Sequence, residues 1–246
     1  KANDVNDVHQ LLNVSMNPIT ISYSLPLKSE TIIPSYDNML RTIQQKLQEN
    51  NVLKPNYQFS FTLKQIDSYE QLALFFGEEI DLSDLFKITS PNPIHKTVAV
   101  LDISQSYFSI AMDMPEEELS NSPIVQEQLS ELIYVGSIEF GRRSILIVES
   151  DLNYQDVKVA LNEILNKSTT KKGDISEKSK SIMASSIIRG LILDPLANEN
   201  ITPDNPLEYL LDYINSDISP NDFGVPIFFT AAWLKDNSVF VNKFTN

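Results

Sequence analysis

Cysteine is absent from the 246-residue chain, so disulfide bonds, cysteine-ligated zinc and a cysteine nucleophile are excluded. Only two histidines occur, His9 and His95, and their separation does not match the ligand spacing of a metal site. The six glycines form no phosphate-binding loop, and no G-x-S-x-G sequence marks a serine nucleophile. We therefore expect no catalytic residue, no metal and no cofactor, and we expect that the protein is not an enzyme.

Acidic residues leave two chemical alternatives open. A pair of catalytic carboxylates of the glycosidase type is conceivable, because any chain with 33 Asp and Glu residues offers candidate pairs. Glu116, Glu117 and Glu118 could bind a cation, although a solvated helix start is the favoured interpretation of such a run.

Positive charge is scarce, since 19 Lys and Arg residues stand against 33 acids and give a formal net charge of −14. Binding nucleic acid through its phosphates needs clustered basic residues, so we expect no nucleic-acid partner. Adsorption to anionic membranes by charge alone is disfavoured for the same reason. No apolar run approaches the roughly 20 residues of a membrane-spanning helix. The chain starts without a basic, apolar leader, so we expect a soluble protein from which any encoded signal peptide has been removed.

Long apolar strands interrupted by short helices dominate the pattern. The run from Thr97 is almost continuously apolar at its start, which indicates a strand buried on both faces. This order of elements predicts an α+β fold with an antiparallel sheet rather than a doubly wound fold. Helices are predicted at 35–51 and 205–218, and strands at 17–26, 57–65, 97–114, 134–150, 181–195 and 225–242.

Two segments fit the helical and the strand period equally well. In the second of them, from Asn153 to Ser181, a strand would place Val157, Val159 and Leu161 on one face. Ile182 and Ala184 then resume an alternation. A helix would instead gather a different set on one face: Val157, Ala160, Leu161, Ile164 and Leu165.

The first such segment runs from Ser68 to Lys96. In a strand, Leu72, Leu74 and Phe76 alternate, as do Ile80 and Leu82; a helix would use Leu72, Phe75, Phe76 and Ile80. A membrane β-strand needs only about 9–11 residues of alternating character. From the residues alone, two surface helices packed on a sheet are the favoured interpretation of both segments.

Several stretches resemble, in sequence and in order, the cholesterol-dependent cytolysins. They are NPITISYSLP, SQSYFSIAMDMP, SIEFGRRSILIVES followed by DVKVALNEIL, and FFTAAWLKDNS. The similarity runs from about Asn17 to the C-terminus and rests on the colinearity of these pieces. It implies a MACPF/CDC-like fold, in which a twisted antiparallel four-stranded central sheet is flanked by helical clusters. Its strands would be roughly Tyr57–Asp67, Thr97–Tyr107, Arg142–Ser150 and Ser181–Asp194.

The resemblance also implies a domain plan and a conformational change. Residues 35–56, 108–141 and 223–236 would form a scaffold domain, and 16–34 and 237–246 a truncated elongated strand domain. Residues 57–107 and 142–222 would form a pore-forming sheet domain. In a ring of subunits, its two helical clusters would become transmembrane β-hairpins at 69–93 and 153–178, since a bilayer accepts strands only as a closed barrel. The implied membrane-insertion residues are Leu72, Leu74, Phe76, Ile80, Leu82, Val157, Val159, Leu161, Ile182 and Ala184.

Departures from the family pattern concern lipid recognition and the hinge. We expect no counterpart of the family's C-terminal β-sandwich with its cysteine- and tryptophan-rich loop, since the sequence has no cysteine and Trp233 is its only tryptophan. Cholesterol binding through this chain is therefore not expected. The paired glycines that free the edge strand would fall at Leu193 and Asp194, which leaves Gly190 and Gly141 as candidate hinges.

Further departures concern the implied subunit interface. An aromatic pair that stacks between neighbouring subunits maps to Phe59 and Ile187, so only one aromatic partner remains. A charge pair maps to Phe61 and about Pro203, so its charges are absent; both phenylalanines could equally be core residues. Poor self-association would call for a different partner subunit.

The sequence thus indicates a secreted pore-forming subunit without a cofactor. A soluble monomer would assemble with a hetero-oligomeric partner of the same family, which supplies membrane recognition, and would then reside in the lipid bilayer of a target cell. The alternative is a non-inserting adaptor or inhibitory homologue that binds a cytolysin partner. The absent glycine pair and the charged tip around Lys171 and Lys172 allow this alternative.

Overall fold

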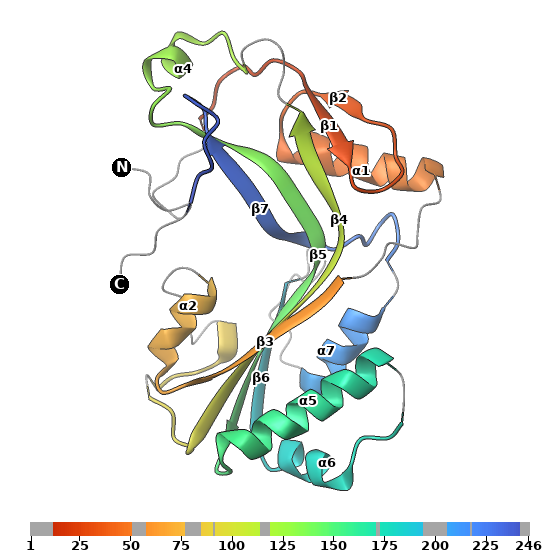
Figure 1. Cartoon of the computed structure of the whole chain (residues 1–246), viewed down its shortest axis with the longest axis vertical. Coiled ribbons are helices and arrows are strands. Elements are labelled where there is room, and N and C mark those ends of the chain that lie inside the picture. Colours follow the sequence, from red (N-terminus) through yellow and green to blue (C-terminus); the bar gives the residue numbers. More distant parts are fainter. Residues whose placement is uncertain are drawn as a thin grey trace. The chain divides into compact units, whose positions relative to one another are not determined.

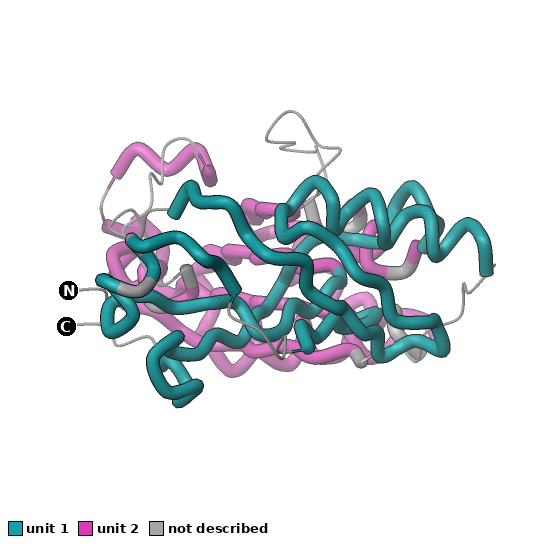
Figure 2. Tube along the Cα trace, turned by 90° about the horizontal axis from the view of Figure 1, so that it is seen from above, with its two compact units in different colours: residues 1–57, 106–141, 218–246 teal, residues 58–105, 142–217 magenta. Residues whose placement is uncertain are grey.

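The computed structural model describes residues 12–50, 58–76, 85–90, 92–113, 119–170, 173–193, 206–216 and 218–241 (Figure 1). The chain divides into two compact units, which Figure 2 distinguishes by colour. Unit 1 comprises residues 1–57, 106–141 and 218–246, and unit 2 comprises 58–105 and 142–217. Strands β4 (Thr97–Asp113) and β5 (Ile133–Ser150) contribute residues to both units. The assignment of scaffold, elongated-strand and pore-forming domains stays a prediction.

Unit 1 is built on strands that pair antiparallel. Strand β1 (Ile19–Tyr23) pairs with β2 (Glu30–Ile32) and with β4, and β7 (Val225–Trp233) pairs with β5. Helix α1 (Tyr36–Asn50) begins after Ser35, whose hydroxyl accepts a hydrogen bond from the Asn38 amide at 3.1 Å. The predicted helix at 35–51 is confirmed as α1, which buries Met39, Ile43 and Leu47. A short helix, α4, spans Pro123–Glu127.

Unit 2 is built on the strand order β3 (Gln58–Ile66), β4, β5 and β6 (Ile187–Leu193). Strands β5 and β6 pair antiparallel, from Arg143 opposite Leu193 to Glu149 opposite Ile187. The helices of this unit are η1 (Tyr69–Leu72), α2 (Ala73–Phe76), α5 (Tyr154–Thr170), α6 (Glu177–Ala184) and α7 (Pro206–Asn215). The predicted α+β class, with an antiparallel sheet and flanking helices, is confirmed.

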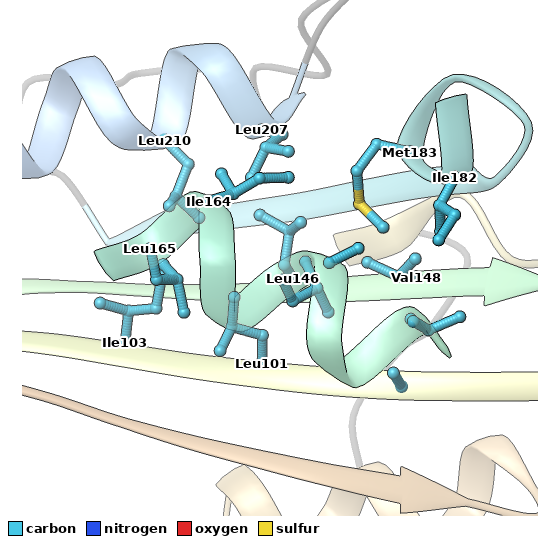
Figure 3. Close-up of a cluster of buried hydrophobic side chains, with 14 of the residues drawn as sticks. Leu101, Ile103, Leu146, Val148, Ile164, Leu165, Ile182, Met183, Leu207 and Leu210 are labelled. Atoms are coloured by element: carbon cyan, nitrogen blue, oxygen red, sulfur yellow. The ribbon is translucent and has the colours of Figure 1, made fainter. Parts of the chain in front are cut away.

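Apolar residues cover both faces of the unit 2 sheet. Alternate residues of β4 and β5, such as Leu101 and Leu146, pack under α5, α6 and α7 (Figure 3). Their neighbours, such as Val100 and Ile147, pack on the other face with residues of η1 and of 85–88. Figure 1 shows α2 and α5–α7 on opposite sides of these strands. The continuous apolar run from Thr97 follows from this double burial, as predicted.

One predicted strand boundary is wrong. The sequence pattern extends a strand from Ser181, but residues up to Ala184 belong to α6 and the strand begins at Ile187. The hydroxyl of Ser176 accepts from the Ser179 amide and caps the N-terminus of α6, while Ile182 and Met183 bury its apolar side. The cap and the two buried residues therefore favour a helix where alternation alone favoured a strand.

The last predicted strand is too long. Strand β7 ends at Trp233, and the chain turns through Leu234–Asn237, where Asn237 has a φ of +57°. The carboxylate of Asp236 accepts bonds from the amide and the hydroxyl of Ser238, which closes the turn. The chain then returns beside β7, with a single bridge between Ala232 and Val239.

Candidate assembly edges and insertion segments

The candidate interface residues lie on the two outer strands of the unit 2 sheet. Phe59 and Phe61 are on β3, with ring centroids 6.1 Å apart, and Ile187 opens β6. Phe59 packs partly against the core under α5–α7, whereas Phe61 and Ile187 are 37% and 42% exposed. Among the described strands, β3 pairs only with β4 and β6 only with β5. Phe61 and Ile187 are therefore available at opposite edges, while Phe59 also serves the core.

The first insertion segment is partly helical and partly outside the described residues. Leu72 ends η1 and is fully buried, whereas Leu74 and Phe76 lie on α2. Ile80 and Leu82 fall outside the described ranges. Leu72 joins Tyr69, Phe86 and Ile88 in the core on this face of the sheet.

A polar anchor ties the start of this segment to the sheet. Tyr69 is 3% exposed and lies near Glu149 on β5, whose carboxylate acts on the pKa of its hydroxyl. Glu149 is itself buried and forms an ion pair with Arg189 on β6. Burial, followed by the effect of Glu149, raises the pKa of Tyr69 above its ordinary value of 10.0. The phenol therefore stays protonated beside the carboxylate.

A second polar anchor holds the end of α2. The guanidinium of Arg143 on β5 binds both carboxylate oxygens of Asp102 on β4, at 3.1 and 2.8 Å. It also donates to the Phe75 carbonyl at 3.0 Å, within α2. The ammonium of Lys64 lies 5.8 Å from the centre of the Phe75 ring. Cationic side chains of the sheet thus contact Phe75 of α2.

The second insertion segment is helical, and its helical interpretation is confirmed for the isolated chain. The five residues that the helical period places on one face of α5 are all at most 3% exposed: Val157, Ala160, Leu161, Ile164 and Leu165. Val159, which a strand would group with Val157 and Leu161, points away from this core and is 52% exposed. On α6, Ile182 is buried and Ala184 is exposed. Insertion of these residues into a membrane stays a prediction.

Glu163 joins α5 to α6. Its carboxylate accepts bonds from the Ser176 amide at 3.0 Å, the Ser176 hydroxyl at 2.6 Å and the Ser179 hydroxyl at 2.5 Å. Lys167 forms an ion pair with the same carboxylate at 2.8 Å. These bonds, that of Lys167 first, hold the pKa of Glu163 well below its ordinary value of 4.5. Glu163 thus holds α6 against α5, and its bonds would have to break before this segment could form a hairpin.

Arg142 fixes α7 to the same unit. Its fully buried guanidinium donates to the carbonyls of Tyr213 and Ser216 at 2.6 and 2.7 Å, at the C-terminus of the helix. It also lies 4.8 Å from the centre of the Tyr213 ring. The Tyr213 hydroxyl donates to the Leu193 carbonyl at 2.8 Å, so α7 is tied to the end of strand β6.

The candidate hinge glycines lie within strands. Gly190 pairs with Leu146 in the β5–β6 ladder, and Gly141 pairs with Val225 at the end of the β5–β7 ladder. Leu193, where the family glycine is expected, is the last residue of β6, and Asp194 and Pro203 lie outside the described ranges. A hinge role for either glycine stays a prediction.

Other candidate chemistry is sparse. His95 lies 3.1 Å from the Asp151 carboxylate, and no group of three His, Asp or Glu residues suited to a metal occurs in the described part of the chain. His9 and Glu116–Glu118 are outside that part. None of the helices that the structure describes is long and apolar enough to cross a bilayer.

The anchors were not found by sequence reasoning, although a signal for them exists. Asp102 and Glu149 lie in apolar stretches of β4 and β5, and Arg189 is the only charged residue of β6. A charge in such a strand needs a partner when it is buried. The signal predicts that partners exist, but the identity of each partner depends on strand register.

Comparison with known proteins places the chain in a broader context. Residues 5–246 match the sequence profile of the family described as thiol-activated cytolysin. The chain is 23% identical to perfringolysin O from Clostridium perfringens over 257 residues, covering 93% of this chain and 50% of that protein. It is 24% identical to tetanolysin from Clostridium tetani, covering 93% of this chain and 48% of that protein. The chain thus spans about half the length of these relatives.

Solved structures show the same fold. A pneumolysin structure matches with a TM-score of 0.69 at 19% identity, covering 94% of this chain and 54% of that chain. A structure of suilysin from Streptococcus suis matches with a TM-score of 0.68 at 16% identity, covering 93% of this chain and 54% of that chain. These matches agree with the α+β architecture derived above.

Proposed function

The chain belongs to the thiol-activated cytolysin family, and from this premise we propose that it is a pore-forming subunit. A soluble monomer joins a ring of subunits, and its two helical segments convert into transmembrane β-hairpins. The observation that carries this proposal is the state of the 153–184 segment. Its sequence fits a strand, yet it rests as α5 and α6 over a sheet core in water.

The dual period supports a conversion because each period serves one environment. The helical period buries five residues of α5 in the core of the soluble unit. The strand period would instead gather Val157, Val159 and Leu161 on a face suited to lipid. Helix α5 alone has 17 residues, which exceeds the roughly 9–11 that one transmembrane strand needs.

The edge residues support assembly with a partner subunit. Phe61 and Ile187 are exposed at opposite edges of one sheet, as a head-to-tail ring requires. The aromatic pair implied by the family would here join Phe59 to Ile187, and an aromatic ring facing an aliphatic side chain makes a weaker self-pair than two aromatic rings do. We therefore propose a hetero-oligomer in which a second family member supplies membrane recognition. In this proposal the protein is secreted and reaches its final state in the target-cell membrane.

Disulfide locking tests the conversion. The chain has no cysteine, so an introduced pair has no background thiol. One lock joins the buried face of α5 to β4 or β5, and a second joins η1 to β5, each at a Cα separation of about 5–6 Å. A control disulfide joins Thr20 and Thr31 of unit 1, which are already opposite each other in the β1–β2 register.

Dye release from liposomes, with and without a longer family member, is the measurement. Each segment lock should abolish release and reduction should restore it, whereas the control disulfide should leave release unchanged. Release that continues at full rate with both segments locked would overturn the proposed insertion.

A non-inserting adaptor is the second candidate function. The observation that favours it is Leu193 at the end of β6, where the family glycine is expected. Leucine lacks the conformational freedom of glycine, which could keep the edge strand in place. An adaptor would bind the longer family member and reduce its dye release, and both segment locks would leave that inhibition intact.

A further inference from the structure

We propose that one end of the unit 2 sheet is an apolar contact site for the surface of a lipid bilayer, where Ile94 and Leu152 enter the outer acyl region. The contact is weak and reversible, so membrane recognition stays with the partner subunit. The role of this site in pore formation rests on the proposed function, whereas the contact with lipid is measured without any pore.

The start of β4, the end of β5 and the start of β6 lie together at this end of the sheet (Figure 1). Glu149 of β5 is opposite Ile187 of β6 in register. The hydroxyl of Thr97, the first residue of β4, donates to the Leu152 carbonyl in the turn after β5, at 2.7 Å. The loop that precedes β4, residues 92–96, therefore lies beside that turn.

Aliphatic side chains are exposed at this end. Ile94 is 86% exposed, more than any other large apolar residue of the described ranges. Leu152 is 39% exposed in the neighbouring turn, and Ile187 is 42% exposed at the start of β6. A single exposed aliphatic residue is common on protein surfaces, but several that gather at one place mark an interaction site.

The loop that carries Ile94 is held in place. Nδ1 of His95 lies 3.1 Å from the Asp151 carboxylate, which ties this loop to the turn after β5. The ring of Pro93 fixes one backbone angle next to Ile94. The loop therefore presents Ile94 to solvent and does not fold it onto the sheet.

The residue types of the two loops favour lipid over a protein partner. Residues 92–96 (NPIHK) and 151–153 (DLN) contain no Trp, Tyr or Arg, which are the usual anchors of protein interfaces. Their charged residues, Lys96 and Asp151, are of opposite sign and offer no surplus charge to a charged surface. Aliphatic side chains enter the acyl boundary of a bilayer without needing a matching pocket.

The position of the site relative to the insertion segments favours the same occupant. Ile94 directly follows the first segment, 69–93, and Leu152 directly precedes the second, 153–178. Hairpins formed by these segments would extend the sheet beyond this end. The two side chains therefore lie where the strands of the proposed barrel would cross the bilayer surface.

A polarity-sensitive label tests the contact directly. The chain has no cysteine, so Ile94→Cys carries a single nitrobenzoxadiazole label. Ile33→Cys is the matched control, because Ile33 is also an exposed isoleucine, at 51%, but belongs to unit 1. With excess phosphatidylcholine vesicles, the label at position 94 should shift to the blue and brighten, and the label at position 33 should not. An unchanged spectrum at position 94, or the same change at both positions, overturns the inference.

Serine variants measure what the side chains contribute. Vesicle flotation gives the partition of the unlabelled chain onto the same vesicles. Ile94→Ser should lower the partition coefficient about three- to tenfold, and Ile33→Ser should leave it unchanged. Leu152→Ser should act in the same direction as Ile94→Ser. Equal partition of Ile94→Ser and the parent protein would assign any binding to another surface and overturn the site.

Two further conditions separate this occupant from others. Phosphatidylserine in the vesicles should not improve binding, because the chain has a formal net charge of −14. Binding that requires phosphatidylserine would assign the contact to charge and overturn an apolar site. A blue shift that grows with protein concentration in the absence of vesicles would assign the surface to contacts between copies, which also overturns it.

The label and the test of pore formation fail independently. A selective blue shift at position 94 combined with no dye release from liposomes would retain the contact site and reject the pore. Dye release that is blocked by the segment locks, combined with an unchanged label at position 94, would retain the pore and reject the contact site.

Discussion

Gly224 packs directly against the backbone of Gly141. A Cβ atom on Gly224 would lie 2.1 Å from the Gly141 carbonyl oxygen and 2.6 Å from its carbonyl carbon. Gly224 also has a φ of +82°, a conformation that residues with a side chain rarely adopt. Two independent constraints therefore require glycine at this position in unit 1.

Replacing this glycine should destabilise unit 1. Gly224→Ala should lower the free energy of unfolding by about 2–5 kcal/mol, from the strained φ and the backbone clash together. Gly173→Ala is the matched control, since Gly173 has a φ of +76° but no atom within 4 Å of the added Cβ. It should lose only about 1–2 kcal/mol. Urea denaturation measures both, and equal losses would contradict the role of the close approach.

The buried face of α5 should dominate the stability of the second segment. Leu161→Ala should cost about 2–5 kcal/mol of unfolding free energy, because Leu161 is fully buried and its removal leaves a cavity. Val159→Ala, on the exposed side of the same helix, should change it by no more than about 0.5 kcal/mol. Urea denaturation compares them, and similar losses would show that α5 does not pack as described.

Val159 should matter on membranes although it does little in water. In the proposed hairpin it faces lipid, where a lysine costs about 2–4 kcal/mol near the bilayer midplane. Val159→Lys should therefore fold normally and reduce dye release strongly. Asn162→Lys, of the opposite strand parity, should release dye as the parent protein does. Full release by Val159→Lys would argue against a lipid-facing strand with this register.

The α5–α6 connection should weaken in acid through Glu163. Because the native pKa of Glu163 is held well below 4.5, its contribution to stability is complete above that value and is lost as the pH falls below it. Amide exchange at residues 174–184, corrected for intrinsic rates, should show this opening between about pH 5 and pH 3.

Two variants at α5 and α6 make the assignment specific. Glu163→Gln should open the connection at neutral pH and remove most of the acid dependence. Glu177→Gln, whose carboxylate is 89% exposed, should leave both unchanged. An acid-induced opening of the same size in Glu163→Gln would assign the effect to another group.

Arg142 should be required for the attachment of α7. Arg142→Met removes the donor from two helix-end carbonyls and should cost about 2–4 kcal/mol, with faster exchange at residues 206–216. Arg41→Met, on the exposed side of α1, should stay within about 0.5 kcal/mol of the parent. Unchanged exchange in α7 of Arg142→Met would show that apolar packing alone retains the helix.

Much of this fold could be predicted from residue periodicity. The buried face of α5 follows a 3.6-residue period, and the run from Val98 to Leu101 is apolar because both faces of its strand are covered. Such patterns are local, so a single sequence contains them.

The boundary at α6 could not be predicted in the same way. Its cap depends on Ser176, whose hydroxyl is held by Glu163 from the preceding helix, 13 residues away. The bond from Arg143 to the Phe75 carbonyl spans 68 residues and depends on how the segment folds over the sheet. Tertiary contacts of this kind override weak local alternation and cannot be read from spacing.

The insertion residues show a different limit. A strand period and a helical period coexist in 153–165, and a structure in water selects only the helical one. Val159 is exposed on α5, although the strand period groups it with Val157 and Leu161. A helix that packed only on the sheet would gain nothing from valine at this position.

The doubly covered sheet of unit 2 limits where unfolding of its coverings can be tolerated. Withdrawal of α5 and α6 would expose leucine, isoleucine and valine side chains of the sheet to water. This exposure costs about 25 cal/mol for each Å² of apolar surface. A monomer in dilute solution has nothing to cover this apolar surface and would aggregate with other copies. The rearrangement therefore carries the least risk of aggregation when lipid or a neighbouring subunit is already present to cover the exposed apolar surface.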